Sequence, residues 1–166
     1  MAIRTVEEYY KSLGKLHPTA YILGEKVKNV HEHPLIKHMV AAVAKTFEME
    51  NDPVGAKLLV ADSDLINEKV SRFAKFYKSP DDLLAKIRML KFMAQNVGGC
   101  YMRCTGMDAL NAVGIEVFNC DKKYGTKYWE KFLNFVKMIQ QNDFALFSGV
   151  TDVKGDRSLR PSHQKD

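Results

Sequence analysis

The sequence is poor in cysteine, with three residues among 166. So few cysteines, and an odd number of them, argue against a disulfide framework and indicate a reducing, cytoplasmic environment. Runs of 18 or more apolar residues are missing, so we expect no membrane-spanning helix. The opening residues, MAIRTVEEYY, lack the apolar segment of a secretory signal. Internal repeats and low-complexity tracts are also missing.

The charged residues form no basic block. Lysine and arginine number 25 against 20 aspartate and glutamate, a net charge of +5, and the lysines are spread along the chain. This pattern argues against a nucleic-acid partner. A small positive surplus helps to attract an anionic ligand or partner, although most of these charges suit solvated helix faces. An apolar content of 46% in a chain of this length is enough for one domain with a core.

Apolar residues recur at helical spacing along most of the chain and predict a mainly α-helical fold. The clearest helix start is Ser79-Pro80, where Ser79 is the cap and Pro80 is the first helical residue. A capping box of Thr5 and Glu8 starts an earlier helix. Helices are predicted at residues 5–13, 31–50, 54–60, 61–77, 80–97, 100–120 and 126–142, with Pro34 in a first turn and Thr126 as a cap. Short strands are predicted at residues 21–23 and 144–147.

The predicted helix at residues 100–120 is apolar on nearly every side, so we expect it to be buried at the centre of the domain. Asp108 and Asn111 are its polar exceptions, and they need partners if they are buried. The pair Gly98-Gly99 precedes this helix. Such a pair either breaks the helix or allows another backbone or a bulky cofactor to approach closely.

Cys100 and Cys104 stand four residues apart at the start of this helix. In helical geometry, residues at this spacing share a face, with Cβ atoms about 5–6 Å apart. A relaxed disulfide needs a shorter Cβ separation of ~3.8 Å, so the pair suits a shared metal or cluster better than a bond to each other. The other interpretation is that both thiols fill the core, where free cysteine is common.

Further metal ligands are scarce. The histidines His31, His33 and His38 do not follow the spacing of an H-E-x-x-H motif, and we expect them to be structural or surface residues. Met107 stands where a radical-SAM motif would need its third cysteine, and Cys120 is expected to be a buried small apolar side chain. A [4Fe–4S] cluster needs four ligands, and this chain offers no convincing second pair.

A second polar motif, VTDVKGDR, lies near the end of the sequence. Threonine and aspartate side chains, a glycine that admits close approach, and flanking lysine and arginine suit contact with a phosphate or a flavin. A plain polar turn explains the same residues. The candidate contact residues are Val150, Thr151, Asp152, Val153, Lys154, Gly155, Asp156 and Arg157.

These motifs together resemble the 4-hydroxybutyryl-CoA dehydratase family, also called the vinylacetyl-CoA Δ-isomerase family. It is a branch of the flavin-dependent 4-hydroxyphenylacetate 3-hydroxylase superfamily. The matching stretches are GEKVKNVHEHPLI (24–36), CYMRCTGMDALNAV (100–113), DKKYGTKY (121–128) and TDVKGDRSLRPSHQKD (151–166). The resemblance implies the helical N-terminal domain of an acyl-CoA-dehydrogenase-like flavoprotein at residues 1–148. Residues 149–166 would be a connecting segment towards a middle β domain that this chain lacks.

The resemblance also implies cofactors and partners. Members of the family are much longer than this chain, form homotetramers, and hold FAD and one [4Fe–4S] cluster in each subunit. Cys100 and Cys104 would supply two cluster ligands, residues 150–157 would contact FAD, and the other ligands, a cysteine and a histidine, would lie in the absent domain. The substrate would be an acyl-CoA, either 4-hydroxybutyryl-CoA or vinylacetyl-CoA. This chain alone is expected to be inactive and to bind no intact cluster.

Two other interpretations remain open. The chain could be the same domain from the hydroxylase branch, of the 4-hydroxyphenylacetate 3-monooxygenase type, which uses reduced flavin and no cluster. Cys100 and Cys104 discriminate between the branches, because an enzyme without a cluster does not need both. The chain could also be a non-catalytic helical interaction module, which predicts that serine at both positions leaves the full-length protein unaffected.

Overall fold

The protein is an assembly of helices with two short β-hairpins, as the computed structural model describes for residues 3–149, 155–156 and 158–164. This described part contains the helices α1 Val6–Leu13, α2 Lys37–Asn51, α3 Ala56–Leu59, α4 Pro80–Val97, α5 Arg103–Tyr124 and α6 Tyr128–Asn142. The strands are β1 Ala20–Ile22, β2 Glu25–Val27, β3 Val60–Ser63 and β4 Glu68–Ser71, and the 3-10 turns are η1 Val30–Glu32, η2 Arg72–Ala74 and η3 Pro161–His163. The predicted mainly α-helical fold is confirmed.

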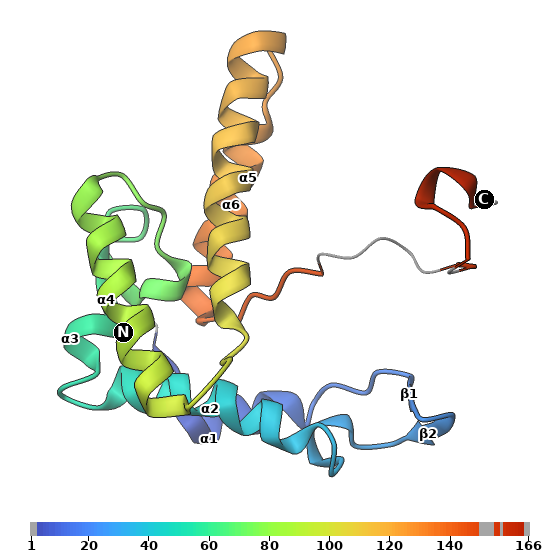
Figure 1. Cartoon of the computed structure of the whole chain (residues 1–166). Coiled ribbons are helices and arrows are strands. Elements are labelled where there is room, and N and C mark those ends of the chain that lie inside the picture. The colour runs from blue at the N-terminus through green and yellow to red at the C-terminus, as the bar shows by residue number, and fades with distance from the viewer. Residues whose placement is uncertain (1–2, 150–154, 157, 165–166) are drawn as a thin grey trace.

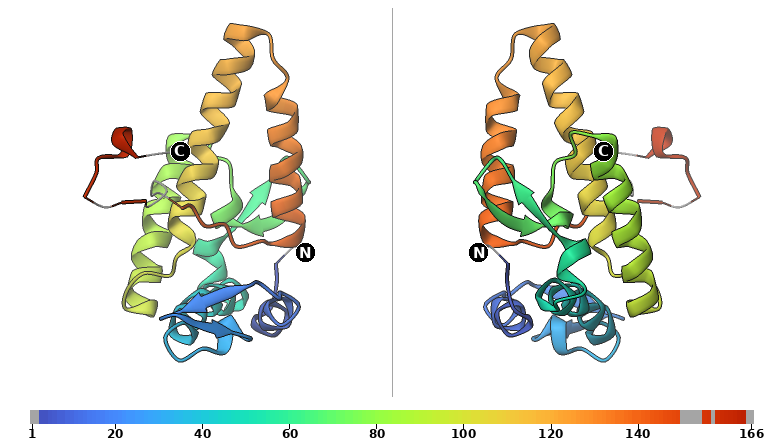
Figure 2. Two further views of the ribbon diagram at one scale, coloured as in Figure 1. Left: turned by 90° about the vertical axis from the view of Figure 1, so that its right-hand side faces the viewer. Right: turned by 90° about the vertical axis from the view of Figure 1, so that its left-hand side faces the viewer.

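Helices α5 and α6 form a long antiparallel pair that projects from the rest of the molecule (Figure 1). Helices α1 and α2 pack on each other across the base of this pair, and α4 stands beside α5 (Figure 2). The β3–β4 hairpin lies against α6, while the β1–β2 hairpin extends from the layer of α1 and α2. The connection from α4 to α5 therefore reaches the point where α2, α4 and α5 converge.

The buried side chains form three clusters. One joins α1 to α2, one joins α3 and α4 to the start of α5, and one joins α5 to α6. Representative residues of the three are Phe47, Met93 and Val136, all nearly or fully buried. The start of α5 belongs to the second cluster and the middle of α5 to the third, so α5 links the two halves of the core.

Helix α5 is buried only along part of its length. Met107 and Leu110 lie in the core, whereas Val113, Ile115 and Phe118 expose about half of their surface. The expectation of a helix buried on all sides is wrong for the C-terminal half, which has α6 beside it and otherwise stands clear of the described helices (Figure 1). Cys120, expected to be buried, is half-buried for the same reason.

The two polar residues of α5 do have partners. The Asp108 carboxylate pairs with the Lys86 ammonium of α4. Asn111 accepts a hydrogen bond from the backbone N–H of Tyr77 (2.8 Å) and donates one to the carbonyl of Lys75 (3.1 Å). Both contacts fix the helix against segments that precede it in the chain.

Two helix starts follow the predicted capping chemistry. Thr5 Oγ1 accepts from the Glu8 N–H (3.1 Å) while the Glu8 carboxylate accepts from the Thr5 N–H (2.8 Å), as expected of a capping box. Ser79 caps α4, which ends at Gly98 with φ of +71°, a backbone conformation that favours glycine. The predicted start at residue 31 is wrong, because the chain there forms η1 and a turn around Pro34 before α2 begins at Lys37.

The cap of α6 differs from the prediction. Thr126 does not cap the helix; its hydroxyl donates to Asp121 Oδ1 (2.5 Å). The Asp121 carboxylate accepts the backbone N–H groups of Tyr128 (2.9 Å) and Trp129 (2.8 Å) instead. The last turn of α5 thus caps the first turn of α6, which fixes the sharp reversal between the two helices.

Residues 61–77, predicted as a helix, form the β3–β4 hairpin and η2. In β3 the side chains of Ala61 and Ser63 are buried and that of Asp62 is exposed, the alternation of a strand. The two strands pair antiparallel, with Val60 opposite Ser71. A second hairpin, β1–β2, turns through Leu23 and Gly24, which both have positive φ, as a two-residue hairpin turn requires. The expected strand at residues 21–23 therefore had a partner that the sequence reasoning missed.

The predicted strand at residues 144–147 is wrong, because this segment has no strand partner among the described residues. It runs against the first turns of α5, where Gly106 faces Leu146. A Cβ atom at Gly106 would lie 2.1 Å from the carbonyl oxygen of Leu146. Glycine at this position therefore allows the chain after α6 to pass close to the helix.

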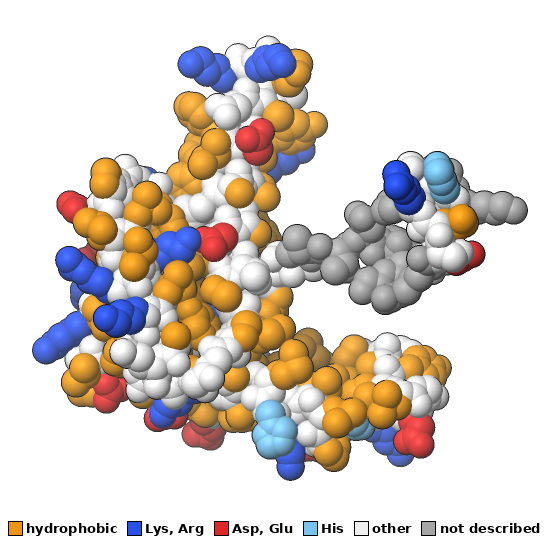
Figure 3. Space-filling view, in the orientation of Figure 1, with side chains coloured by type: hydrophobic (Ala, Val, Ile, Leu, Met, Phe, Trp, Pro, Cys, Tyr) orange, Lys and Arg blue, Asp and Glu red, His pale blue; other side chains and the backbone are white. Residues whose placement is uncertain are grey.

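Apolar side chains gather over α4 and along α5 on the face seen in Figure 3. On α4 they include Leu83, Leu84 and Ile87, each about half exposed or more. No helix among the described residues is both long and apolar enough to span a bilayer. Leu83, Leu84 and Ile87 thus leave apolar surface on α4 exposed to solvent.

Candidate functional site

The two cysteines of the candidate site lie where α4 gives way to α5. Cys100 belongs to the connection and is exposed, whereas Cys104 is the second residue of α5 and is half-buried. Because the helix begins only at Arg103, the predicted helical relation between the cysteines is wrong. The two thiols nevertheless lie near each other, since Cys100 is among the groups that perturb the Cys104 thiol. Burial, and secondarily the neighbouring Cys100, raises the pKa of the Cys104 thiol.

A tight backbone reversal between the cysteines brings the thiols together. Met102 has φ of +66° and ψ of −28°, in the left-handed region that non-glycine residues rarely adopt. The Arg103 N–H donates to the carbonyl of Tyr101 (2.8 Å), and the Met102 N–H donates to Cys100 Sγ (3.4 Å). Strained backbone of this kind persists only where surrounding contacts hold it.

Tyr101 anchors the connection in the core. Its side chain is 5% exposed and packs near Phe73, with ring centroids 5.7 Å apart. Burial raises the pKa of the Tyr101 phenol, and Cys104 and Cys100 add to the rise. The connection that holds Cys100 is therefore fixed to the core through the Tyr101 ring.

Arg103 is the functional-site residue that sequence reasoning missed. Its side chain is 1% exposed, and its guanidinium forms ion pairs with the buried carboxylates of Glu50 and Asp143, both at 3.1 Å. One signal was available in the sequence: Glu50 lies three residues after the apolar Phe47, at a spacing that places both on one face of a helix. A carboxylate on a buried face needs a cationic or hydrogen-bonding partner.

One cation faces two buried carboxylates in this cluster, so full ionisation leaves an uncompensated negative charge. Burial raises the pKa of Glu50 to about 7, against the lowering effect of Arg103 and with a further rise from Asp143. Ser71 donates its hydroxyl to Glu50 Oε1 (2.5 Å), and Oε2 has no hydrogen-bond partner among the described residues. A proton on Glu50 would leave the cluster neutral.

The described residues bring two thiols close to each other at this point. No group of three or more His, Cys, Asp and Glu side chains placed to hold a metal ion occurs among them. The residues fit part of a cluster site in one respect, since two neighbouring thiols lie here, with Cys100 exposed and Cys104 at the edge of the core. They would need ligands from elsewhere to complete it.

Only part of the second predicted motif can be placed. Val150, Thr151, Asp152, Val153, Lys154 and Arg157 lie outside the described residues. Gly155 and Asp156 are exposed. Gln164 folds back on this segment, accepting from the Asp156 N–H (2.8 Å) and donating to its carbonyl (2.6 Å). Hydrogen bonds from Ser158 lower the pKa of the Asp156 carboxyl.

Residues 5–166 match the protein family described as 4-hydroxyphenylacetate 3-hydroxylase N terminal. The chain belongs to this family. It is 43% identical over 164 residues to 4-hydroxybutyryl-CoA dehydratase/vinylacetyl-CoA-Δ-isomerase of Clostridium aminobutyricum, covering 99% of this chain and 34% of the relative. It is 26% identical over 164 residues to the oxygenase component of 4-hydroxyphenylacetate 3-monooxygenase of Thermus thermophilus, covering 98% of this chain and 33% of the relative.

Solved structures share the fold of this family domain. An oxygen-tolerant archaeal 4-hydroxybutyryl-CoA dehydratase from N. maritimus matches with a TM-score of 0.89 and 40% identity, over 99% of this chain and 32% of that chain. The oxygenase component of 4-hydroxyphenylacetate 3-monooxygenase, complexed with FAD and 4-hydroxyphenylacetate, matches with a TM-score of 0.73 and 22% identity, over 98% and 33% respectively. The chain therefore spans about a third of the length of these relatives.

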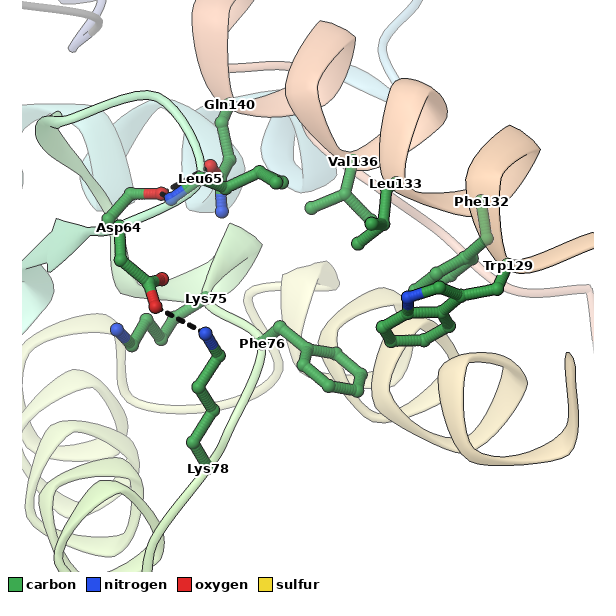
Figure 4. A pocket seen from close by; sticks show the side chains of 11 residues that line it. Asp64, Leu65, Lys75, Phe76, Lys78, Trp129, Phe132, Leu133, Val136 and Gln140 are labelled. Carbon is green, nitrogen blue, oxygen red and sulfur yellow. Dashed lines mark hydrogen bonds and ion pairs between the residues drawn. The ribbon is translucent and has the colours of Figure 1, made fainter. Parts of the chain in front are cut away.

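The family domain also contains a cavity of about 200 Å³, apart from the cysteines. Trp129 and Phe132 of α6 and Phe76 form its apolar wall, and the ion pair of Asp64 with Lys78 lies at one side (Figure 4). Its polar atoms are already engaged: Gln140 accepts from the Ser63 hydroxyl (2.7 Å) and donates to the Ala74 carbonyl (2.9 Å). This cavity reaches neither thiol, because none of residues 98–104 lines it.

Proposed function

We propose that this chain is the N-terminal portion of an enzyme of the 4-hydroxybutyryl-CoA dehydratase/vinylacetyl-CoA isomerase type that works with FAD and a [4Fe–4S] cluster. The observation that carries the proposal is the placement of Cys100 and Cys104 on either side of the Met102 reversal in a chain 43% identical to such a dehydratase over 164 residues. In this reading the two thiols supply two cluster ligands. The acyl-CoA substrate, the remaining ligands and the catalytic groups belong to the rest of the subunit and to its homotetramer.

The residues of this chain would hold the cluster. Cys100 lies exposed on the connection, while Cys104 is fixed by the first turn of α5. Tyr101, buried between them in the sequence, would hold the connection to the core. When bound, the cluster would supply a Lewis acid for the hydroxyl oxygen of the substrate.

The flavin part of the proposal concerns residues 150–157. Gly155 and Asp156 are exposed, which leaves them accessible to a ligand or to another domain. A related oxygenase component is described in complex with FAD. We therefore assign residues 1–148 to the helical domain and residues 149–166 to a segment that contacts FAD and leads to a middle β domain.

Iron and sulfide analysis under anaerobic conditions tests the proposal. The chain is expressed with and without the rest of its reading frame, and visible spectra are recorded for both forms. We expect iron and sulfide only in the long form. Cys100→Ser and Cys104→Ser should remove the iron, whereas Cys120→Ser, on the same helix but away from the pair, should retain it. Iron in neither form, or iron retained in Cys100→Ser, would contradict the proposal.

The hydroxylase branch is the second candidate, supported by 26% identity to the oxygenase component over 164 residues. It predicts flavin-dependent hydroxylation in the long form that survives serine at both cysteines. An interaction module without chemistry predicts neither iron nor hydroxylation. The adjacent thiols favour the dehydratase, because neither alternative needs them.

A further inference from the structure

Arg103 belongs both to the cysteine segment and to the buried charge cluster. It is the residue before Cys104, and its N–H closes the reversal at Met102. We propose that Arg103 is a positioning residue, whose buried guanidinium fixes the separation of the Cys100 and Cys104 sulfurs. This inference rests on the proposed function, because it names what prepares the same two thiols for their cluster.

The guanidinium is held from three directions. Nη1 donates to Thr46 Oγ1 (2.9 Å) and Glu50 Oε1 (3.1 Å) of α2. Nη2 donates to Ser71 Oγ (3.1 Å) at the end of β4 and to Asp143 Oδ1 (3.1 Å) after α6. The planar fork of arginine fits several acceptors at once, so the position of its head is determined by segments distant in sequence.

Two aromatic rings enclose the same group. The guanidinium carbon lies 4.5 Å from the ring centroid of Phe47 and 4.5 Å from that of Phe73. Phe73 also packs on Tyr101, which precedes the reversal. The head of Arg103 and the ring of Tyr101 are therefore held by one common aromatic side chain, on either side of Met102.

The fixed Arg103 head restricts the backbone of the segment that holds both sulfurs. The Cα atoms of Tyr101 and Arg103 are both held by buried side chains, so Met102 between them is confined to its left-handed conformation. In that conformation the Met102 N–H reaches Cys100 Sγ at 3.4 Å. If the Arg103 head moved, the reversal would be free to relax to an ordinary backbone conformation, and the Cys100 sulfur would leave Cys104.

A purely structural ion pair would behave differently. Weakening such a pair would lower the stability of the fold. The distance between the two thiols would stay the same in the molecules that remain folded. The separation of the thiols is therefore the property to measure, with the stability of each variant determined in parallel.

Phenylarsine oxide measures that property without iron or flavin. Two thiol groups condense with one arsenical: two As–S bonds form, and the arsenic-bound oxygen leaves as water with both thiol hydrogens. The reduced 166-residue chain is titrated anaerobically, free thiols are counted, and affinity is obtained by competition with 2,3-dimercaptopropanol. We expect the wild type to lose two thiols per arsenical bound, and Cys100→Ser to show no bridging.

Variants of the charge cluster test the role of Arg103. Arg103→Lys retains the charge but loses the fork and the stacking, and Asp143→Asn weakens one arm without altering the cysteine segment. Each should lower the affinity for the arsenical by about tenfold, the usual scale for residues that orient metal ligands. Asp121→Ala is the matched control, since it removes the acceptor of two backbone N–H groups at the opposite end of α5. It should change the affinity by less than about twofold, because distant sites act independently.

Urea unfolding of every variant shows which of them fold cooperatively, and Asp143→Asn provides the test if Arg103→Lys does not. Wild-type affinity in the cluster variants would overturn the inference. So would an equal loss in Asp121→Ala, or a wild type that forms no bridge. If the bridge depends on Arg103 but the long form contains no iron, the positioning role stands and the proposed function fails.

Discussion

The guanidinium of Arg103 and the carboxylate of Asp143 meet at 3.1 Å, which joins the first residue of α5 to the residue that ends α6. Asp143 has φ of +44°, and its other oxygen accepts the backbone N–H of Arg4 at 3.0 Å. The chain before α1, the start of α5 and the end of α6 are thus tied at one buried point. The candidate cysteine site lies directly beside this junction.

The first prediction concerns the pH dependence of stability. Burial raises the pKa of Glu50 from 4.5 to about 7, so between these values the folded state binds one proton more than the unfolded chain. The contribution of Glu50 to the free energy of unfolding should therefore fall as pH rises from about 4.5 to 7.

Glu50→Gln should remove this slope, because glutamine does not titrate. Urea unfolding of both proteins at several pH values between 4.5 and 7.5 measures the difference, in which the effects of the other carboxyl groups cancel. A constant difference across this range would show that Glu50 titrates in the folded protein as it does in the unfolded chain.

The second prediction concerns the close passage of the chain after α6. A Cβ at Gly106 would lie 2.1 Å from a backbone oxygen of Leu146, which cannot move aside as a flexible side chain could. Gly106→Ala should destabilise the fold by about 1–3 kcal/mol, the usual cost of overpacking. At Gly99 an added Cβ would meet nothing within 4 Å, so Gly99→Ala serves as the control. Equal urea midpoints for the two variants would refute the contact.

The third prediction concerns the turn between α5 and α6. Asp121→Ala removes the acceptor of two backbone N–H groups, those of Tyr128 and Trp129. Thr126→Val removes only the hydroxyl that donates to the same carboxylate. The urea concentration at the midpoint of unfolding should therefore fall further for Asp121→Ala than for Thr126→Val. The reverse order would restore Thr126 as the cap of α6.

Elements that depend on near neighbours could be predicted from the sequence. The caps at Thr5 and Ser79 use partners three residues away, so the local sequence is enough to predict them. Residues 61–77 were misread because short apolar stretches satisfy both helical and strand periodicity. The hairpin there is fixed by Ser63 donating to Gln140, 77 residues later, and no local pattern reveals such a contact.

In the candidate site too, the local features could be predicted from the sequence and the distant contacts could not. The cysteine pair was found because its spacing is short, but the helix was placed three residues too early, at Cys100 rather than Arg103. The partners of the Arg103 guanidinium lie 32 to 57 residues away, so the lysines and arginines were read as solvated charges. Buried charge is rare enough that composition argues against it, and only the three-dimensional packing reveals where it is paired.

The fourth prediction concerns self-association of the isolated chain. Leu83, Leu84 and Ile87 form an exposed apolar stripe on α4, and such stripes promote association in water. We expect concentration-dependent association in sedimentation velocity, reduced by Ile87→Lys. Gln95→Lys adds the same charge to another exposed position of α4 and should leave the association unchanged. A compact monomer at all concentrations would contradict the prediction.

The last prediction concerns the cluster itself. Two thiols can occupy two of the four ligand positions of a [4Fe–4S] cluster, and the described residues bring no third His, Cys, Asp or Glu to them. Iron and sulfide added anaerobically to the 166-residue chain should therefore be removed by a desalting column that contains a chelator. The same treatment of the long form should leave its iron bound, because the remaining ligands close the site. A stable ~4 Fe per chain in the short form would mean that the two cysteines suffice, or that residues beyond them in this chain complete the set.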